Sequence, residues 1–305
     1  MYRRAPRRLK TEPGSCVHMP TKHHDLPVSP IFTLLLSQAI FGAWGVVAHQ
    51  VRLAALALIF VMAASGYLFA RAFLTGHRLS VPARSLWVGL NLFLDIFLLI
   101  YAYRRAPLAL VITIHYLGPM IVQFVAPFAL GERPRRLQVV LAGFGFIGGA
   151  LVAGPRWNGH DAAGLLAALG SALTLAGNII LQKRRMLHTD NPMAAVSEYN
   201  IVLAIVAGCA MLLSGQILAP FTHGLRVLLY AALAGILVQG IAMFLFNYSL
   251  TAMRGAVVAI VSSTEIIFAS LFGFFLYGQT LTPIQIVGIA VVASVVVALK
   301  FAEAP

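Results

Sequence analysis

Three ionisable side chains lie within long apolar runs of the sequence. Asp95 and Glu265 each lie about ten residues into a run, and His115 lies about eight residues into another. If the runs are membrane-spanning helices with a rise of about 1.5 Å per residue, these positions fall near the middle of the bilayer. A charged side chain there costs roughly 3 kcal/mol, so each needs a partner or a function. We therefore take all three as candidates to bind a positively charged substrate group or a coupling proton.

The spacing of further polar residues groups them with these three. Asn91 precedes Asp95 by four residues, which places both side chains on one face of a helix. Ser262 precedes Glu265 by three residues, and a shift of 147 residues carries His115 onto Ser262. If a two-fold axis relates the two parts of the chain, these faces confront each other across a central cavity.

Other apolar runs also carry polar side chains at helical spacing. One run contains a stripe made of Ser171, Thr174, Asn178 and Gln182. A later run offers Gln239 and Asn247. We include Asn178, Gln239 and Asn247 among the candidates for substrate or proton binding, although such residues also join neighbouring helices by hydrogen bonds.

Each candidate has a structural interpretation beside the functional one. Asp95 and Glu265 could be neutral, protonated acids in structural hydrogen bonds, and His115 could be a histidine packed in the core. Pro119 removes a backbone donor in the run of His115, which predicts a helix kink with a role in gating. Alternatively, the proline is only tolerated there.

Two further acidic residues lie close to basic segments. Glu198 is expected to pair with the cluster Lys183, Arg184 and Arg185. Glu132 is followed by arginines, and a simple loop ion pair is one interpretation. Separately, a small-residue pair is formed by Gly145 and Gly149, which predicts close helix packing.

Motifs of soluble enzymes are absent from the sequence. It contains no glycine-rich phosphate loop, no Cys/His cluster with metal-binding spacing, and no nucleophile beside a base. Cys16 and Cys209 also lack such spacing, and we expect free thiols. We therefore predict no catalytic residues, no metal site, no cofactor and no enzyme activity.

The composition defines the class of protein. Of the 305 residues, 60% are hydrophobic and 10% are charged, whereas about a quarter of a soluble domain is charged. We predict an all-α polytopic membrane protein with ten transmembrane helices joined by short connections. The apolar runs are 30–49, 53–73, 85–103, 107–130, 136–154, 162–182, 193–215, 225–249, 255–277 and 282–301.

The distribution of basic residues predicts the orientation. The net charge of +13 arises largely from the N-terminal tail and short loops, which argues against nucleic-acid binding. With both termini in the cytoplasm, seventeen of the 22 Lys and Arg residues lie inside and five outside. Residues 1–29 are basic and rich in proline, so we expect a disordered cytoplasmic tail, and either Met1 or Met19 could be the true start. A secretory signal peptide is not evident.

The chain also repeats itself. A shift of 147 residues places Gly131 on Gly278 and Gln138 on Gln285. We interpret residues 30–154 and 162–302 as two five-helix repeats. Because five is odd, the two repeats run in opposite directions across the membrane, an arrangement common in secondary transporters.

Two segments carry a resemblance to a known family. The first is YLGPMIVQFVAPFALGERP in the fourth run, and the second is STEIIFASLFGFFLYGQTLT in the ninth. With the ten-helix pattern, the chain resembles the EamA family of the drug/metabolite transporter superfamily over roughly residues 30–302. The second segment departs from the family pattern, with Glu265-Ile266 instead of Glu-Pro and Gly278-Gln279 instead of Gly-Glu. Any role of a second terminal glutamate therefore does not carry over.

The resemblance implies a transporter of small metabolites, often an exporter, with a central cavity lined by both halves. We predict a secondary transporter of the bacterial inner membrane, working by alternating access, with protons as a candidate coupling ion. Because every Lys and Arg lies at a run end or in a loop, we expect cationic, zwitterionic or neutral substrates such as amino acids or amines. An uptake permease, a non-transporting membrane protein and an intramembrane enzyme are the alternatives, and a homodimer stays open.

Overall fold

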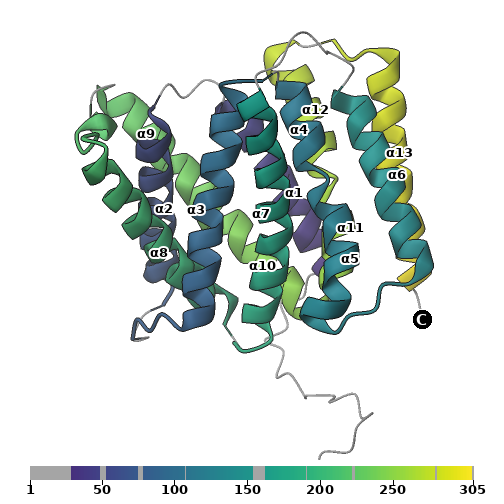
Figure 1. Cartoon of the computed structure of the whole chain (residues 1–305), viewed down its shortest axis with the longest axis horizontal. Coiled ribbons are helices and arrows are strands. Elements are labelled where there is room, and N and C mark those ends of the chain that lie inside the picture. Colours follow the sequence, from purple (N-terminus) through teal and green to yellow (C-terminus); the bar gives the residue numbers. More distant parts are fainter. Residues whose placement is uncertain are drawn as a thin grey trace, which may run out of the picture.

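The computed structural model describes residues 29–48, 53–74, 78–106, 108–153, 162–189, 191–221, 224–278 and 280–303. Within these residues every regular element is a helix (Figure 1). The elements are α1 (Pro30–Ala48), α2 (Ala55–Ala72), α3 (Ala83–Tyr103), α4 (Leu108–His115), α5 (Gly118–Leu130), α6 (Arg136–Ala153), α7 (Ala162–Met186), α8 (Pro192–Leu213), the 3-10 helix η1 (Ala219–Phe221), α9 (Gly224–Gly235), the π-helix η2 (Ile236–Ala242), α10 (Met243–Ala252), α11 (Gly255–Ser262), α12 (Glu265–Tyr277) and α13 (Pro283–Glu303).

These helices form ten apolar segments within the described residues, as predicted. Seven are long and apolar enough to cross a membrane. The other three are shorter apolar helices, Pro30–Trp44, Arg136–Val152 and Pro283–Leu299. The chain is therefore a multi-pass membrane protein. The predicted disordered tail falls on residues 1–28, which lie outside the described part of the chain, and on Ser29.

Two of the ten segments are each broken into two helices. The break between α4 and α5 lies at Tyr116 and Leu117, and that between α11 and α12 lies at Ser263 and Thr264. The bounds of these four helices coincide under the predicted shift, since 108–115 becomes 255–262 and 118–130 becomes 265–277. In Figure 1, α4 lies above α5 whereas α12 lies above α11, so the two broken segments run in opposite directions.

The ends of the broken segments are also alike. Gly131 follows α5 with a φ of 68°, and Gly278 follows α12 with a φ of 62°. Both angles are left-handed, a conformation that glycine adopts without steric cost and that commonly terminates helices. The glycine stop that the sequence repeats is thus the same backbone turn in both places.

The first break is explained by Pro119. This residue lies in the first turn of α5 and has no N–H to donate to the carbonyl of His115, four residues earlier. The Leu117 N–H instead bonds the carbonyl oxygen of Ile114, three residues earlier, with an N to O distance of 3.0 Å, which makes a tighter turn than an α-helix. The sequence predicted a bend inside a continuous helix, and the structure shows a helix end followed by a new start.

The second break has no proline and depends on side-chain hydroxyls. Ser262 donates to the Val258 carbonyl at 2.9 Å. Ser263 donates to the Ile260 carbonyl at 2.6 Å, and the last of the three, Thr264, bonds the carbonyl three residues earlier. Three consecutive hydroxyls bonded to the preceding turn compete with the helical ladder and bend or interrupt it.

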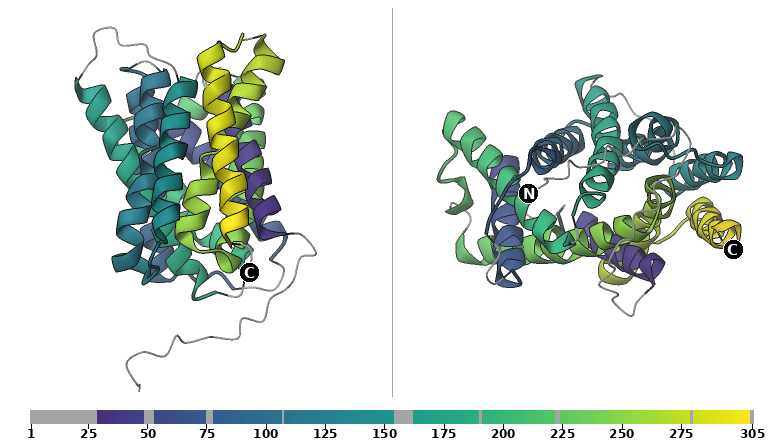
Figure 2. Two further views of the ribbon diagram at one scale, coloured as in Figure 1. Left: turned by 90° about the vertical axis from the view of Figure 1, so that its right-hand side faces the viewer. Right: turned by 90° about the horizontal axis from the view of Figure 1, so that it is seen from below.

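Close packing through glycine joins distant parts of the chain. α6 and α13 lie side by side at one edge of the molecule (Figure 2). An added Cβ at Gly288 would lie 2.6 Å from the carbonyl oxygen of Gly148, so neither position has room for a larger residue. An added Cβ at Gly149 would lie 2.9 Å from Ile266 of α12, which agrees with the predicted close packing, whereas at Gly145 the nearest atom is Ser263 Oγ at an ordinary 3.4 Å.

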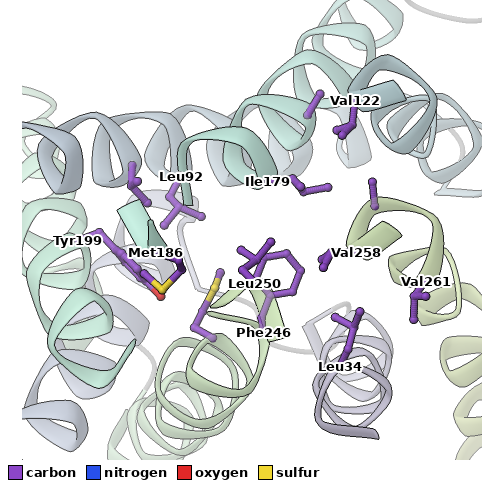
Figure 3. Packing of buried hydrophobic residues seen from close by; sticks show 14 of the residues in the cluster. Leu34, Leu92, Val122, Ile179, Met186, Tyr199, Phe246, Leu250, Val258 and Val261 are labelled. Atoms are coloured by element: carbon purple, nitrogen blue, oxygen red, sulfur yellow. The ribbon is translucent and has the colours of Figure 1, made fainter. Parts of the chain in front are cut away.

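A large apolar cluster fills the middle of the molecule (Figure 3). It combines Leu92 and Val122 of the first five segments with Ile179, Leu250 and Val258 of the last five. The two parts of the chain therefore share one core, and the polar residues below are embedded in it.

Candidate functional site

Asp95 of α3 accepts a side-chain hydrogen bond at each of its two carboxylate oxygens. Its Oδ1 accepts a hydrogen bond from the Thr174 hydroxyl at 2.8 Å. Its Oδ2 accepts one from the Asn178 side chain, also at 2.8 Å. The carboxylate is 7% exposed, and both donors are neutral. The polar stripe on α7 thus faces α3 and contacts a candidate binding residue directly.

Asn91 extends this contact by one helical turn. Its Nδ2 donates to Asn178 Oδ1 at 2.6 Å and to the Thr174 carbonyl oxygen at 2.8 Å. Gly177 of α7 makes the approach possible, because an added Cβ would lie 3.0 Å from Asn91 Oδ1. Two residues of α3 and two of α7 therefore interlock in one polar layer.

His115 joins the same layer from α4. Its Nδ1 lies 3.0 Å from the Ser171 hydroxyl oxygen. Ser171 uses its own proton to bond the Ala168 carbonyl at 2.8 Å. Because that proton is committed, Nδ1 must carry the hydrogen toward Ser171. In a neutral ring, Nε2 is then left as the acceptor.

Glu265 begins α12 immediately after the second break, and it meets the first break there. Its carboxylate is hydrogen-bonded to the hydroxyl of Tyr116. The Tyr116 ring packs edge-on to His115, with 5.7 Å between ring centroids. Asp95, Glu265 and the hydroxyl of Tyr103 also lie within electrostatic range of one another. The two helix breaks and the two carboxylates thus belong to one region.

The other candidates lie elsewhere. The Ser262 hydroxyl donates to the Val258 carbonyl of its own helix at 2.9 Å. Gln239 lies in η2, where its backbone carbonyl accepts a 2.8 Å hydrogen bond from Asn200. Asn247 donates to the Tyr199 hydroxyl at 2.7 Å. The Asn247 side chain and the Gln239 backbone are therefore bonded to α8, whereas the bonds of Asp95 are to α7.

Comparison with known proteins follows this geometry. Residues 162–300, which include the polar stripe, η2, both parts of the second broken segment and Glu265, match the model of the EamA-like transporter family. The second half of the chain, called the EamA-like half below, is therefore similar to the EamA-like transporter family. The resemblance expected from the sequence is thereby confirmed for this half.

Two relatives extend the comparison. An uncharacterized transporter of Bacillus subtilis (strain 168), YwfM, is 33% identical over 132 residues. The match covers 43% of this chain and 43% of the relative, so it spans less than half of that protein. A protein of known crystal structure aligns with 90% of this chain and 100% of its own, with a TM-score of 0.76 at 17% identity. The second likeness shows a shared fold.

The EamA-like half also contributes the buried ion pair that the sequence predicted. Glu198 of α8 lies 2.8 Å from the guanidinium of Arg185, and both side chains are about nine-tenths buried. The Ser85 hydroxyl of α3 donates to the same carboxylate at 2.5 Å. This pairing confirms the expected partner of Glu198 and ties α3, α7 and α8 together.

The Glu132 carboxylate makes contacts beyond its own loop. Its two oxygens accept backbone hydrogen bonds from Gly255 at 3.1 Å and Ala256 at 3.2 Å. Glu132 therefore caps the N-terminus of α11 in the EamA-like half. This contact could not be predicted from local sequence, because Glu132 and Gly255 are 123 residues apart.

Tyr116 is the site residue that sequence reasoning missed. It is 7% exposed and lies between two candidates, His115 by sequence and Glu265 by hydrogen bond. Tyr116 precedes the helix-breaking Pro119 by three residues. That spacing could have identified it as a polar group at a helix break. Thr174 and Ser171 were seen only as members of a stripe.

Pro119→Ala tests the role of the first break. The variant restores an N–H that can bond the His115 carbonyl, so α4 and α5 can join into one helix and displace Tyr116 and His115. We expect a folded protein whose transport rate falls roughly fivefold, the equivalent of one net hydrogen bond. Transport by reconstituted protein provides the measurement. An unchanged rate would show that the proline is only tolerated.

Proposed function

We propose that the protein is a secondary transporter that exports small cationic, zwitterionic or neutral solutes, such as amino acids or amines. It works by alternating access between two inverted five-helix repeats, residues 30–154 and 162–302. Three observations support the repeats: the 147-residue shift of four helices, the shared glycine stops, and the opposite directions of the broken segments. Broken helices at mid-membrane are typical of transporter binding sites.

The observation that supports the substrate class is the presence of two carboxylates in one region, Asp95 within α3 and Glu265 at the second helix break. Asp95 is bonded by neutral donors, and Glu265 by a tyrosine hydroxyl. Within the described residues, Lys and Arg lie in loops or in the end turns of helices. The site therefore has a negative or neutral field, and the low dielectric strengthens its preference for positive groups. The same carboxylates are the groups that would take up a coupling proton.

The proposed membrane location, orientation and partners of the protein complete this function. The charge distribution supports a bacterial inner-membrane location with both termini in the cytoplasm. The partners are the lipid bilayer and a small-molecule substrate, with no nucleic acid. An uptake permease would use the same site in the opposite direction. A non-transporting membrane protein or an intramembrane enzyme would leave the two interacting mid-membrane carboxylates without a transport role.

Flux into proteoliposomes tests the proposal. Purified protein is reconstituted with an imposed pH gradient, and the uptake of radiolabelled lysine, putrescine or tetraphenylphosphonium is compared with that of glucose 6-phosphate. We expect protein-dependent flux of at least one positively charged solute and none of the multiply charged anion. Flux of the anion alone would overturn the substrate class, and conversion of a solute into a product would indicate an enzyme.

A further inference from the structure

Four helix ends meet at the lower end of the molecule in Figure 1. They are the C-terminal ends of α5, α7 and α10 and the N-terminal end of α11. We call this region the basic end; it is defined by Arg133, Lys183, Arg184, Arg185 and Arg254. The helix ends come from both halves of the chain, so the contacts between them determine whether the halves are closed together here.

The cap of α11 is unusual because the helix does not provide it. Its own N-cap residue, Arg254, makes no side-chain capping bond. The free N–H groups of Gly255 and Ala256 bond instead to the carboxylate of Glu132, which follows α5. Free N–H groups and the helix dipole both make a negative group favourable at this position. Glu132 and α11 thus link the two halves of the chain by charge-assisted hydrogen bonds.

Neighbouring contacts hold α5 and α11 in the same register. Gln123 Nε2 donates to the Ala256 carbonyl oxygen at 2.9 Å. Arg254 donates to the Arg133 carbonyl oxygen at 2.6 Å. An added Cβ at Gly255 would lie 2.9 Å from Leu130, so no space separates the two helix ends. The basic end is closed around the contact of Glu132.

Lys183 closes the same region from α7. Its buried ammonium group donates to the Leu250 carbonyl at 2.8 Å and to the Met253 carbonyl at 2.7 Å. These carbonyls lie at the C-terminal end of α10, just before α11 begins. The chain that enters α11 is therefore fixed on one side by Lys183 and capped on the other by Glu132.

We propose that Glu132 is the latch of the basic end: its hold on the N-terminus of α11 keeps that end closed, and its release opens it. The proposal rests on the alternating access proposed above. α11 is eight residues long and leads through Ser263 and Thr264 into Glu265. A movement of α11 away from Glu132 therefore also moves Glu265, which couples the closed end to the candidate binding site.

Spin-label distances test the latch without any substrate. With Cys16→Ser and Cys209→Ser as background, one cysteine pair replaces Phe128 and Ala252, two exposed residues at the basic end. A second pair replaces Arg104 and Phe275, exposed at the opposite end. Double electron–electron resonance then gives the distance distribution at each end in Glu132→Ala, Glu132→Gln and the unmutated protein.

In Glu132→Ala we expect the open fraction at the basic end to rise roughly fivefold, as for the loss of a typical helix cap. Glu132→Gln should give a smaller rise, because its amide oxygen still accepts but carries no charge. The matched control is Asn191→Ala, which removes two similar backbone bonds, to Met193 and Ala194, within a single helix. It should leave both distributions unchanged.

The outcomes separate the latch from the transport function. If Glu132→Ala keeps the distance distribution of the unmutated protein while folding normally, the latch is refuted. The same holds if Asn191→Ala opens the basic end equally, since the effect would then report general destabilisation. If Glu132→Ala opens the basic end but the unmutated protein moves no solute in proteoliposomes, the latch stands and the proposed transport falls.

Discussion

Glu265→Gln is expected to reduce the transport of a cationic solute by roughly 10- to 100-fold, the equivalent of one hydrogen bond to a charged group, about 1.5–3 kcal/mol. The substitution keeps the shape of the side chain. Its amide oxygen can still accept the hydrogen bond that Tyr116 makes to the carboxylate. What disappears is the negative charge at the start of α12, and with it the attraction for a positive group in a low-dielectric site.

The measurement is the initial rate of flux into proteoliposomes, with equal amounts of protein in each preparation. Asp95→Asn should also lower the rate, because it removes the second carboxylate of the site. Ser270→Ala is a matched control on the same helix, since the Ser270 hydroxyl bonds the Ile266 carbonyl of that helix at 2.9 Å. Unimpaired flux in Glu265→Gln would exclude this residue from both substrate binding and proton coupling.

Glu198→Ala should destabilise the protein by about 3–5 kcal/mol, because removal of one partner leaves a buried charge unpaired. Arg185 bonds the carboxylate of Glu198 through both Nε and Nη2, and the Ser85 hydroxyl adds a third donor. In the variant, Arg185 Nη2 and the Ser85 hydroxyl would lose this acceptor, whereas Arg185 Nε would keep its bond to Ser85 Oγ. The free energy of unfolding in mixed micelles, compared with that of the unmutated protein, gives the effect.

A double variant separates the effect of losing the ion pair from the effect of losing side-chain volume. Arg185→Met with Glu198→Leu removes both charges and keeps the volume, so it should be more stable than Glu198→Ala alone. The neighbouring Arg184 makes an exposed bond to the Ala129 carbonyl. Arg184→Ala should therefore change the stability by less than about 1 kcal/mol. A similar loss in Arg184→Ala and Glu198→Ala would contradict the assigned importance of burial.

The membrane segments could be predicted closely from the sequence, because apolar run length is a direct consequence of bilayer thickness. The breaks were harder. Pro119 predicted the first break. The second break depends on the hydroxyls of Ser262, Ser263 and Thr264, and such residues occur equally in unbroken helices. The π-helix η2 also left no local signal in the sequence; it packs against α2, where an added Cβ at Gly66 would lie 2.6 Å from Gln239 Cβ.

The candidate site could also be predicted only in part from the sequence. Helical spacing correctly placed Asn91 with Asp95, and Thr174 with Asn178, on single faces. It could not say which helix each face would meet. Gln239 and Asn247 were grouped with the site for their polarity, yet their bonds to α8 are made by the Gln239 backbone carbonyl and the Asn247 side chain.

The interlocked layer of α3 and α7 has a mechanical consequence. Four hydrogen bonds link Asn91 and Asp95 to Thr174 and Asn178, although the two helices belong to different halves of the chain. The ion pair of Arg185 and Glu198, with Ser85, adds α8 to the same unit. The helices joined in this way therefore belong to both of the proposed repeats. A hinge must lie outside this three-helix block, or the protein must break the block each time it moves.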